Sequence, residues 1–255
     1  MPVEHLTASN ETKVFFKELT LPQGLNGNEV NGKHYWEVFN DASKSFDDLA
    51  NITETYRRMQ DFYDTLNSGR FFLANAQRDH YPEIYSGNPP AWANNWIKAQ
   101  FLNSAIHAYS ASFDIYLQIL WISFKLYTHI SKYTASSLTN DNIEGILKTC
   151  NINRVESQSA ILGNELCDKI KDFHNSTNSN DVRDLCKQIK HRQTISYSEL
   201  SKDKHPIMIK SDNYNSLDTL VVYSIDDVIF KLKQFHKDLT VLSNYTTPLV
   251  KKQLC

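Results

Sequence analysis

Glycine and proline are scarce in this chain, with seven of each among 255 residues. Because these residues end helices and form turns, their scarcity favours few, long elements over a many-stranded sheet. Cysteine is also rare, and none of the four cysteines belongs to a CxxC pair or lies near a histidine at zinc-finger spacing. We therefore expect free thiols in a reducing compartment at Cys150, Cys167, Cys186 and Cys255.

Long apolar runs are missing as well, and the net charge is close to zero. A membrane-spanning helix needs about 20 mostly apolar residues, but the most apolar segment, residues 113–130, is interrupted by Asp114, Gln118 and Lys125. Residues 1–17 contain no apolar stretch of signal-peptide length. The formal net charge of −2 gives no general attraction to nucleic acid or to anionic lipid. We therefore expect a cytoplasmic protein without a membrane span.

The sequence contains no GxGxxG, P-loop, HExxH or GxSxG motif, so dinucleotide, nucleoside-triphosphate, zincin and hydrolase functions lack their usual sequence support. Its histidines are dispersed, and no ExxH pair of the di-iron kind occurs. We therefore expect neither a bound metal nor a cofactor.

Helical periodicity is clearest in the first half of the chain. Residues 33–67 carry apolar side chains at alternating steps of three and four, which predicts one long amphipathic helix that Ser68 and Gly69 end. A short apolar piece, residues 71–76, follows it. Residues 91–127 predict a second long helix with apolar residues on nearly every side, which we take as the central helix. A short connection between two long helices favours an antiparallel pair.

Shorter elements are expected in the second half. Helices are predicted at residues 139–150 and 155–173, then a polar loop at 174–180 and a helix that Asp181 caps. Residues 193–223 look extended or hairpin-like. Ser224 and Asp227 form a variant capping box that opens a last helix, which Pro248 ends. The fold class is therefore all-α, an up-and-down bundle with an irregular arm at 1–32, one domain at 33–247 and a tail at 248–255.

One predicted helix has a basic face. Taking about 100° per residue, Arg183, Lys187 and Lys190 fall within about 60° of one another, and His191 flanks them. Arg192 can join only if the helix has already ended. Arginine binds phosphate oxygens in a fork, and histidine moves protons near neutral pH, so the set suits a phosphodiester. The alternative is a solvated face of an amphipathic helix whose other side is buried.

The pair Arg183-Asp184 followed by His191 resembles the motif of the HEPN domain, in which an arginine, often followed by a polar residue, precedes a histidine by four to six residues. Here seven residues intervene. The order of two long helices, a motif helix and a final helix is also similar to that family. The resemblance implies an RNA- or nucleotide-binding protein, with Arg183 and His191 as catalytic residues of a metal-independent endoribonuclease and Lys187, Lys190 and Arg192 as nucleic-acid contacts. It also implies a homodimer.

A line of polar residues runs along the otherwise apolar second helix. The line consists of Gln100, Asn103, His107, Asp114, Gln118 and Lys125. Three interpretations remain open: a solvent-facing strip, a buried structural network centred on His107, Asp114 and Gln118, or a ligand site. The protein as a whole is then either an RNA- or nucleotide-binding protein or a non-catalytic helical module for protein interaction or regulation.

Overall fold

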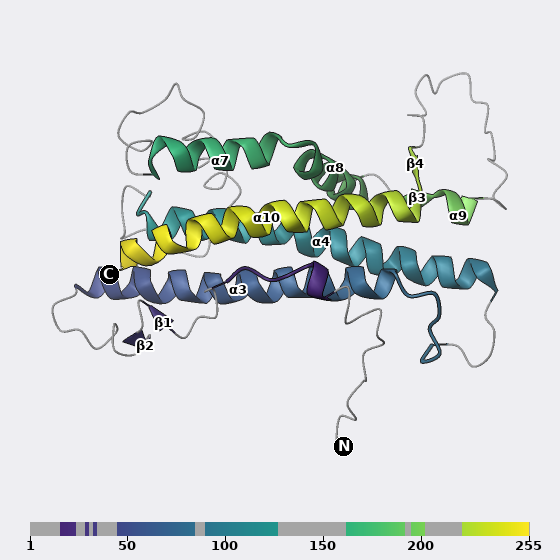
Figure 1. Cartoon of the computed structure of the whole chain (residues 1–255), viewed down its shortest axis with the longest axis horizontal. Helices are drawn as coiled ribbons and strands as arrows, with labels where there is room; N and C mark the ends of the chain where they lie inside the picture. Colours follow the sequence, from purple (N-terminus) through teal and green to yellow (C-terminus); the bar gives the residue numbers. More distant parts are fainter. Residues whose placement is uncertain are drawn as a thin grey trace, which may run out of the picture.

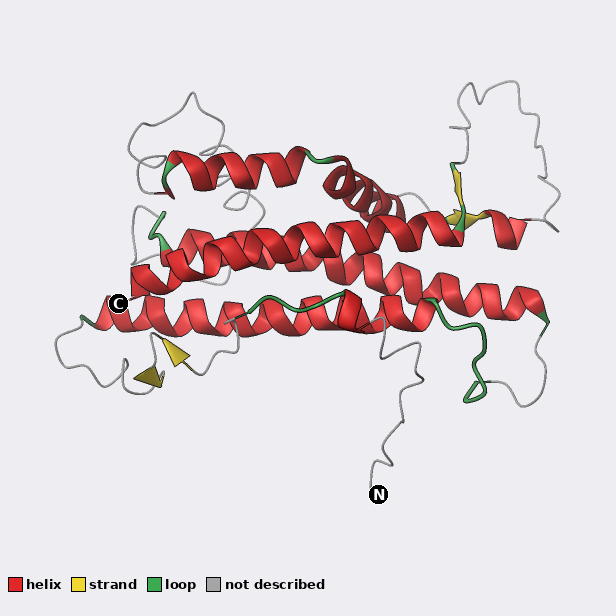
Figure 2. Ribbon diagram, in the orientation of Figure 1, coloured by secondary structure: helices red, strands yellow, loops and turns green. Residues whose placement is uncertain are grey.

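The computed structural model describes residues 16–23, 29–30, 33–34, 45–84, 90–126, 162–191, 195–201 and 221–254. Within these ranges the chain is almost entirely helical, which confirms the all-α fold class (Figures 1 and 2). The helices of the bundle are α3 (Phe46–Ala76), α4 (Ala91–Ser123), α7 (Asn164–Asn175), α8 (Thr177–His191) and α10 (Ile225–Leu254).

Four rods of helix lie side by side along the length of the molecule (Figure 1). Helices α3, α4 and α10 are three of them, and α7 with α8 forms the fourth, which bends between its two halves. Successive rods run in opposite directions, so α4 and α10 point the same way and α3 points against both. This is the up-and-down arrangement that the sequence predicts.

Helix α3 begins and ends later than the sequence predicts. Its N-cap is Ser45, whose hydroxyl accepts a hydrogen bond from the Asp48 amide at 3.1 Å. The expected start at Lys33 is wrong, because β2 (Lys33–His34) pairs antiparallel with β1 (Glu29–Val30). The expected end at residue 67 is also wrong, because the helix continues through Ser68 and Gly69, and the apolar piece at residues 71–76 forms its last turns.

Gly69 sits inside α3 because the two long helices come very close there. A Cβ atom added at Gly69 would lie 3.1 Å from Cε1 of Tyr109 on α4. Tyr109 is completely buried, so its ring has little room to move away. Gly69 therefore allows α3 and α4 to pack closely. From the sequence alone a glycine here predicts the end of a helix, because the contact with α4 is not known.

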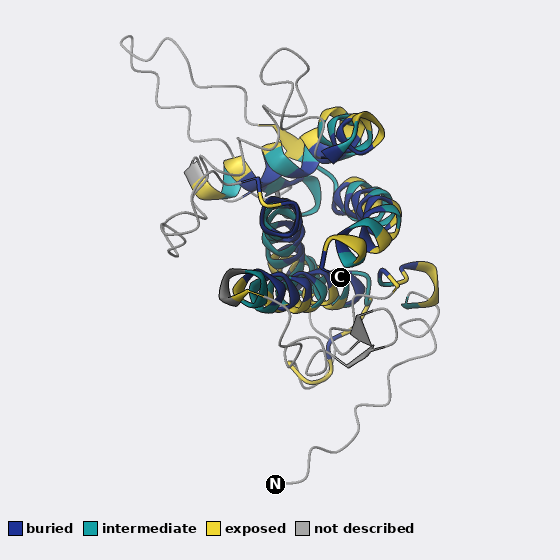
Figure 3. Ribbon diagram, turned by 90° about the vertical axis from the view of Figure 1, so that its left-hand side faces the viewer, coloured by how far each residue is buried: buried dark blue, intermediate teal, exposed yellow. Residues whose placement is uncertain are grey.

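Helix α4 is the most enclosed helix, as its sequence predicts. Nearly half of its 33 residues are buried, among them Leu102, Ile106, Tyr109, Leu117 and Leu120. Helices α3, α8 and α10 all contact it, and the buried sides of the rods face a common interior (Figure 3). No described helix is both long and apolar enough to cross a membrane.

The polar segment 174–180 is not a loop. Helix α7 runs to Asn175, Ser176 alone is extended, and α8 starts at Thr177. The Ser176 hydroxyl accepts a hydrogen bond from the Ser179 amide at 3.2 Å and donates one to the Phe173 carbonyl at 2.8 Å. One serine thus ends α7 and caps α8, and the cap expected at Asp181 is wrong.

Extended backbone is present where the sequence predicts it, but its pairing differs from a hairpin. Strand β3 (Ser196–Tyr197) pairs in parallel with β4 (Val222–Tyr223), and the short helix α9 (Ser198–Ser201) follows β3. The predicted cap of the last helix is confirmed, since the Asp227 amide donates to the Ser224 hydroxyl at 3.0 Å. Residues 202–220 lie outside the described ranges.

Pro248 does not end the last helix. Helix α10 passes through it to Leu254, and both Val250 and Leu254 are buried beyond it. The tail expected at residues 248–255 is therefore, as far as Leu254, a packed part of the bundle. The helix expected at 139–150 and the first part of the one expected at 155–173 lie outside the described residues.

The close contact at Gly69 gives a stability prediction. On an open helix, Gly→Ala stabilises by about 1 kcal/mol. At Gly69 the methyl group meets the buried Tyr109 ring, and overpacking of this kind costs about 1–3 kcal/mol. We expect Gly69→Ala to lower the free energy of unfolding by about 1 kcal/mol, combining these two effects, in urea denaturation. The exposed neighbour Ser68→Ala is the control and should change it by less than about 0.5 kcal/mol. A Gly69→Ala protein more stable than wild type would refute a rigid contact.

Candidate functional site

The two polar features that the sequence singles out lie against each other. The polar line of α4 faces α8, and the charges of Arg183 and Lys190 on α8 act on the Asp114 carboxyl of α4. Lys190 acts in the same way on His107. The basic face of α8 is therefore only partly solvated, and its α4 side meets a half-buried polar surface.

Arg183 is engaged by its own neighbours. Its Nη1 lies 2.6 Å from Nδ1 and 2.5 Å from Nε2 of His174, and its Nη2 donates to the His174 carbonyl at 2.8 Å. Nη2 also donates to the Asn180 side chain. The Nε atom is buried and finds no hydrogen-bond acceptor among the described residues.

These contacts give Arg183 a structural task. The His174 carbonyl belongs to the last turn of α7, where carbonyls lack partners within the helix. By binding it, the guanidinium of α8 ties the two halves of the bent rod together across Ser176. A forked contact with phosphate uses Nη2 together with Nη1 or Nε. Both N–H groups of Nη2 are already donated, to the His174 carbonyl and to Asn180, and Nε is buried.

The structure places His174 beside Arg183, while the pairing with His191 that the sequence suggests stays a prediction. His191 is the last residue of α8, and its side chain, like the whole of Arg192, lies outside the described residues. Lys187 and Lys190 are exposed, and Lys187 lies 3.5 Å from Asp184. The pairing of His174 with Arg183 is not evident from the sequence, because the polar segment around His174 predicts a loop. The capping preference of Ser176 is the one local signal against that loop.

The middle of the polar line of α4 is covered by other parts of the chain, and its two ends are exposed to solvent. His107 Nδ1 lies 3.8 Å from the buried Cys186 sulfur, and the Tyr197 hydroxyl donates to Asn103 at 3.2 Å. Gln118 is half-buried. Gln100, near the start of α4, is exposed, and Lys125, just beyond its end, is exposed and pairs with Asp48 at 2.5 Å.

Burial shifts the pKa values of the titratable groups in this interface. It raises the pKa of Asp114, an effect that the nearby Lys190 and Arg183 partly offset. It lowers the pKa of His107, and Lys190 adds to this. The pKa of His174 falls to about 4 because of burial and of the adjacent Arg183 and Lys187.

This chemistry limits what the interface can do. With a pKa of about 4, His174 is neutral and only weakly basic at neutral pH, which suits packing on Phe113 better than proton transfer. Among the described residues, no three His, Cys, Asp or Glu side chains gather as metal ligands. The contacts here join helices, and they leave Lys187 and Lys190 as the cations that face solvent.

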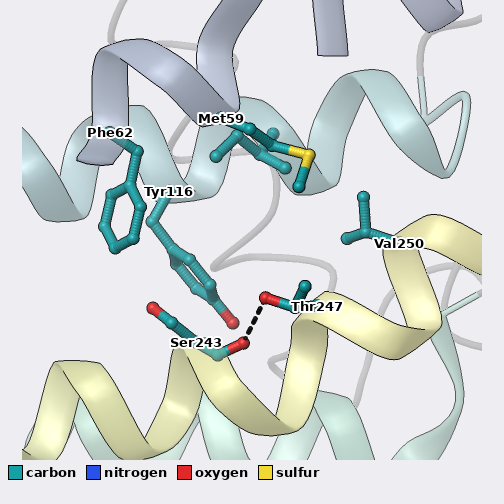
Figure 4. Close-up of a pocket in the computed structure, with 7 residues that line it drawn as sticks. Met59, Phe62, Tyr116, Ser243, Thr247 and Val250 are labelled. Carbon is teal, nitrogen blue, oxygen red and sulfur yellow. Dashed lines mark hydrogen bonds between the residues drawn. The ribbon is translucent and has the colours of Figure 1, made fainter. Parts of the chain in front are cut away.

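The cavity that the described residues enclose at the centre of the bundle is too small for a substrate. A space of about 10 Å³ lies where α3, α4 and α10 meet, and it is lined by Met59, Phe62, Tyr116, Ile119, Ser243, Thr247 and Val250 (Figure 4). Thr247 bonds to the Ser243 carbonyl beside it at 2.8 Å. A space of this size holds about one water molecule.

A larger hollow lies on the surface between α7 and α10. It has a volume of about 450 Å³, within the usual range of ligand sites. Phe173 and Leu242 form its buried floor, and Val241, which is 70% exposed, stands at its edge. Its remaining lining residues are Lys169, Asp172, Ser176, Asp238 and Tyr245. We call this hollow the α7–α10 groove.

The polar rim of the groove carries two acids and one base. Lys169 Nζ lies 4.5 Å from the centre of the Tyr245 ring, so its charge is held against an aromatic face. Asp238 accepts a hydrogen bond from Asn178 at 2.7 Å, and Asp172 is exposed. The lining therefore combines an apolar floor with a negative rim.

The role of Arg183 can be tested by stability. Arg183→Met keeps much of the side-chain volume but removes the contacts with His174 and Asn180, and we expect it to lower the free energy of unfolding by about 1–3 kcal/mol. Lys187→Met, on the exposed face of the same helix, should change it by less than about 0.5 kcal/mol. Urea denaturation of both variants measures the difference. Equal stabilities would show that the guanidinium does not join α7 to α8.

Comparison with known proteins adds no assignment. No protein-family model matches the chain, and neither a curated protein sequence nor a solved structure matches it. The resemblance to HEPN domains therefore stays a prediction, and function has to be argued from the geometry.

Proposed function

We propose that the chain is a non-catalytic helical module that binds another protein through the α7–α10 groove. The observation that carries this proposal is the groove itself, a hollow of about 450 Å³ with an apolar floor beside a valine that is 70% exposed. When a partner covers an exposed side chain such as Val241, the free energy of binding becomes more favourable by roughly 25 cal/mol for each Å² of apolar surface that is removed from water.

The shape and charge of the groove specify the partner. Its lining residues span eight positions on each side, from Lys169 on α7 to its C-cap Ser176 and from Asp238 to Tyr245 on α10, which is about 10 Å or two helical turns. An amphipathic helix inserts two or three apolar side chains over such a distance. Because Asp172 and Asp238 outnumber Lys169, the partner should carry basic residues beside its apolar ones.

The arrangement around Arg183 supports a binding module over a nuclease. The guanidinium is used to join α7 to α8, and the neighbouring imidazole of His174 has a pKa of about 4. Neither group is then free for the clamp and proton transfer that cleavage of a phosphodiester needs. The predicted homodimer and the cytoplasmic location stay predictions, and a second copy of the chain is one of the partners that the test below can detect.

A peptide probe tests the groove. We expect an amphipathic helical peptide of about 14 residues, four turns, with leucines on one face and flanking lysines, to bind the full-length protein. It should bind about tenfold more tightly than the same peptide with flanking glutamates, a difference of about 1.4 kcal/mol. Fluorescence anisotropy measures the affinities, and methyl NMR signals of Val241 and Leu242 locate the site. Val241→Arg should abolish binding by blocking the groove and repelling the lysines.

The matched control is Phe230→Arg. Phe230 is 61% exposed on the same helix but outside the groove, so this variant should bind like the wild type. Asp172→Asn should reduce the preference for lysine without abolishing binding. Loss of binding in both arginine variants, or NMR shifts away from Val241, would contradict the proposal. Analytical ultracentrifugation of the protein alone shows whether a second copy occupies the groove.

The second candidate function is binding of RNA or a nucleotide, and the exposed cations of α8 favour it. Lys187 and Lys190 reach solvent beside the polar line of α4, so a phosphate could bind them while Arg183 adds fixed positive charge. His191 stays the candidate for proton transfer in the catalytic version of this proposal.

Charge reversal tests this candidate. The double variant Lys187→Glu with Lys190→Glu should weaken binding of a single-stranded RNA oligonucleotide. It should also reduce the slope of log affinity against log salt concentration by the amount expected for the loss of about two phosphate contacts. Lys171→Glu with Lys252→Glu, which has the same charge change elsewhere, should leave binding unchanged. Equal losses in both double variants would indicate non-specific attraction. Equal ribonuclease activity in wild type and His191→Ala would reject cleavage.

A further inference from the structure

Residues 16–23 are held on the outside of the bundle across α3 and α10, where they lie as the dark purple segment of Figure 1. We call this segment the strap. Leu19 is completely buried and belongs to the core, and Arg70 of α3 donates to the Phe16 carbonyl at 3.2 Å. The Gln23 amide donates to the Asn244 side chain of α10 at 2.8 Å. The strap is therefore fixed at its two ends and, between them, by the apolar side chains of Leu19, Leu21 and Pro22.

In the middle of the strap the Thr20 carbonyl accepts hydrogen bonds from His236 and, at 3.5 Å, from the Thr240 hydroxyl of α10. His236 of α10 is 1% exposed, and its Nε2 lies 2.8 Å from the Thr20 carbonyl. A carbonyl only accepts, so Nε2 carries the proton and donates it. In the neutral ring Nδ1 is then unprotonated, and it is buried with no hydrogen-bond partner among the described residues. The ring also lies edge-on to Tyr109, with 5.7 Å between ring centroids.

The charges around His236 oppose a second proton. Arg70 approaches from α3, and Lys237 is its neighbour on α10; both are close enough to lower the pKa of the imidazole. Lys233, one turn earlier on α10, and Lys237 both pair with Glu18 of the strap, the one acidic group of these contacts, at 3.4 and 3.0 Å. Tyr109 of α4 is neutral, since burial raises its pKa. A proton on Nδ1 would place a charge beside Arg70 and Lys237 without an acceptor.

We propose that the strap is an acid-released latch, seated while His236 is neutral and detached from α10 when Nδ1 takes up a proton. Detachment admits water to the imidazolium and so removes the desolvation that opposes its charge, while Arg70 and Lys237 stay beside it on α3 and α10. The bundle keeps its remaining helix contacts in the detached form, since α3, α4 and α10 also contact one another directly.

The sign and the pH range follow from linkage. The pKa of His236 falls from 6.5 to about 4 in the seated form, because burial, with smaller contributions from Arg70 and Lys237, outweighs the hydrogen bond to the Thr20 carbonyl, which raises it. A group with a lowered pKa binds protons more readily in the detached form, so seating weakens as pH falls below 6.5. Each pH unit between the two values weakens it by up to about tenfold, or on the order of a hundredfold at pH 4.5. Glu18 stays ionised over most of this range, because Lys237 and Lys233 hold its pKa below its usual value.

Hydrogen–deuterium exchange of the full-length protein tests the latch. The protection factor of the strap amides, corrected for the intrinsic pH dependence of exchange, should fall on the order of a hundredfold between pH 7.5 and 4.5. Amides of residues 102–120 of α4 should keep their protection, which separates strap release from unfolding. His236→Gln retains an N–H donor for the Thr20 carbonyl but does not titrate, so its strap protection should stay constant over this range. Unchanged protection in the wild type, or an equal fall in His236→Gln, would overturn the proposal.

A second measurement does not need a variant. In a histidine NMR titration of the wild-type protein, the His236 ring should titrate below 6.5, between that value and about 4. A midpoint at about 6.5, the value of an exposed histidine, would overturn the latch even if His236→Gln failed to fold.

Discussion

A helix that is apolar on nearly every side has to be surrounded, and α4 sets this constraint for the whole protein. Its buried residues are spread around its circumference, so one partner cannot cover them. Helix α3 covers one side at the short distance that Gly69 permits, and α10 covers another. The side left for α8 carries polar groups, and burial of polar groups is costly unless they find partners.

The polar side of α4 accounts for the polar contacts that α8 and β3 make with the rest of the bundle. Arg183 reaches back to α7, Cys186 meets His107, and Tyr197 meets Asn103, each bond joining parts of the chain that the bundle brings together. An arginine and a histidine in one helical neighbourhood suggest phosphate chemistry when only the sequence is known. In the folded chain Arg183 binds His174 and joins α8 to α7. A binding role is then expected at surfaces whose groups make no such structural contacts, such as the α7–α10 groove.

The sequence was sufficient for what periodicity and composition determine. It predicted the all-α bundle, the central position of α4 and the cap at Ser224, since each depends on local pattern. It failed where a distant partner overrides local preference. Gly69 and Pro248 are helix breakers in isolation, but Tyr109 packs against the first, and the buried Val250 and Leu254 hold the helix together beyond the second.

The candidate site was harder to predict for a related reason. Arg183, Lys187 and Lys190 were placed on the right helix, but their partners could not be predicted from spacing. The segment 174–180 is polar enough to be a loop, and the single extended residue Ser176 decides otherwise by turning the chain and capping the next helix at once. That turn brings His174 against Arg183. A connection of one residue between two helices does not change the local composition. A side-chain pair that depends on such a connection can therefore be identified only from the structure. The α7–α10 groove is of the same kind, since its floor and rim come from two helices more than 60 positions apart in the chain.

The parallel pairing of β3 with β4 has a consequence for how this protein could change over time. Ser196 and Val222 are register partners, so two positions that are distant in the chain are fastened to each other. Once the two ends of a segment are fastened together, the entropy of closing it grows only slowly with its length. Insertions or deletions between β3 and β4 would therefore cost folding little and leave the long helices in register.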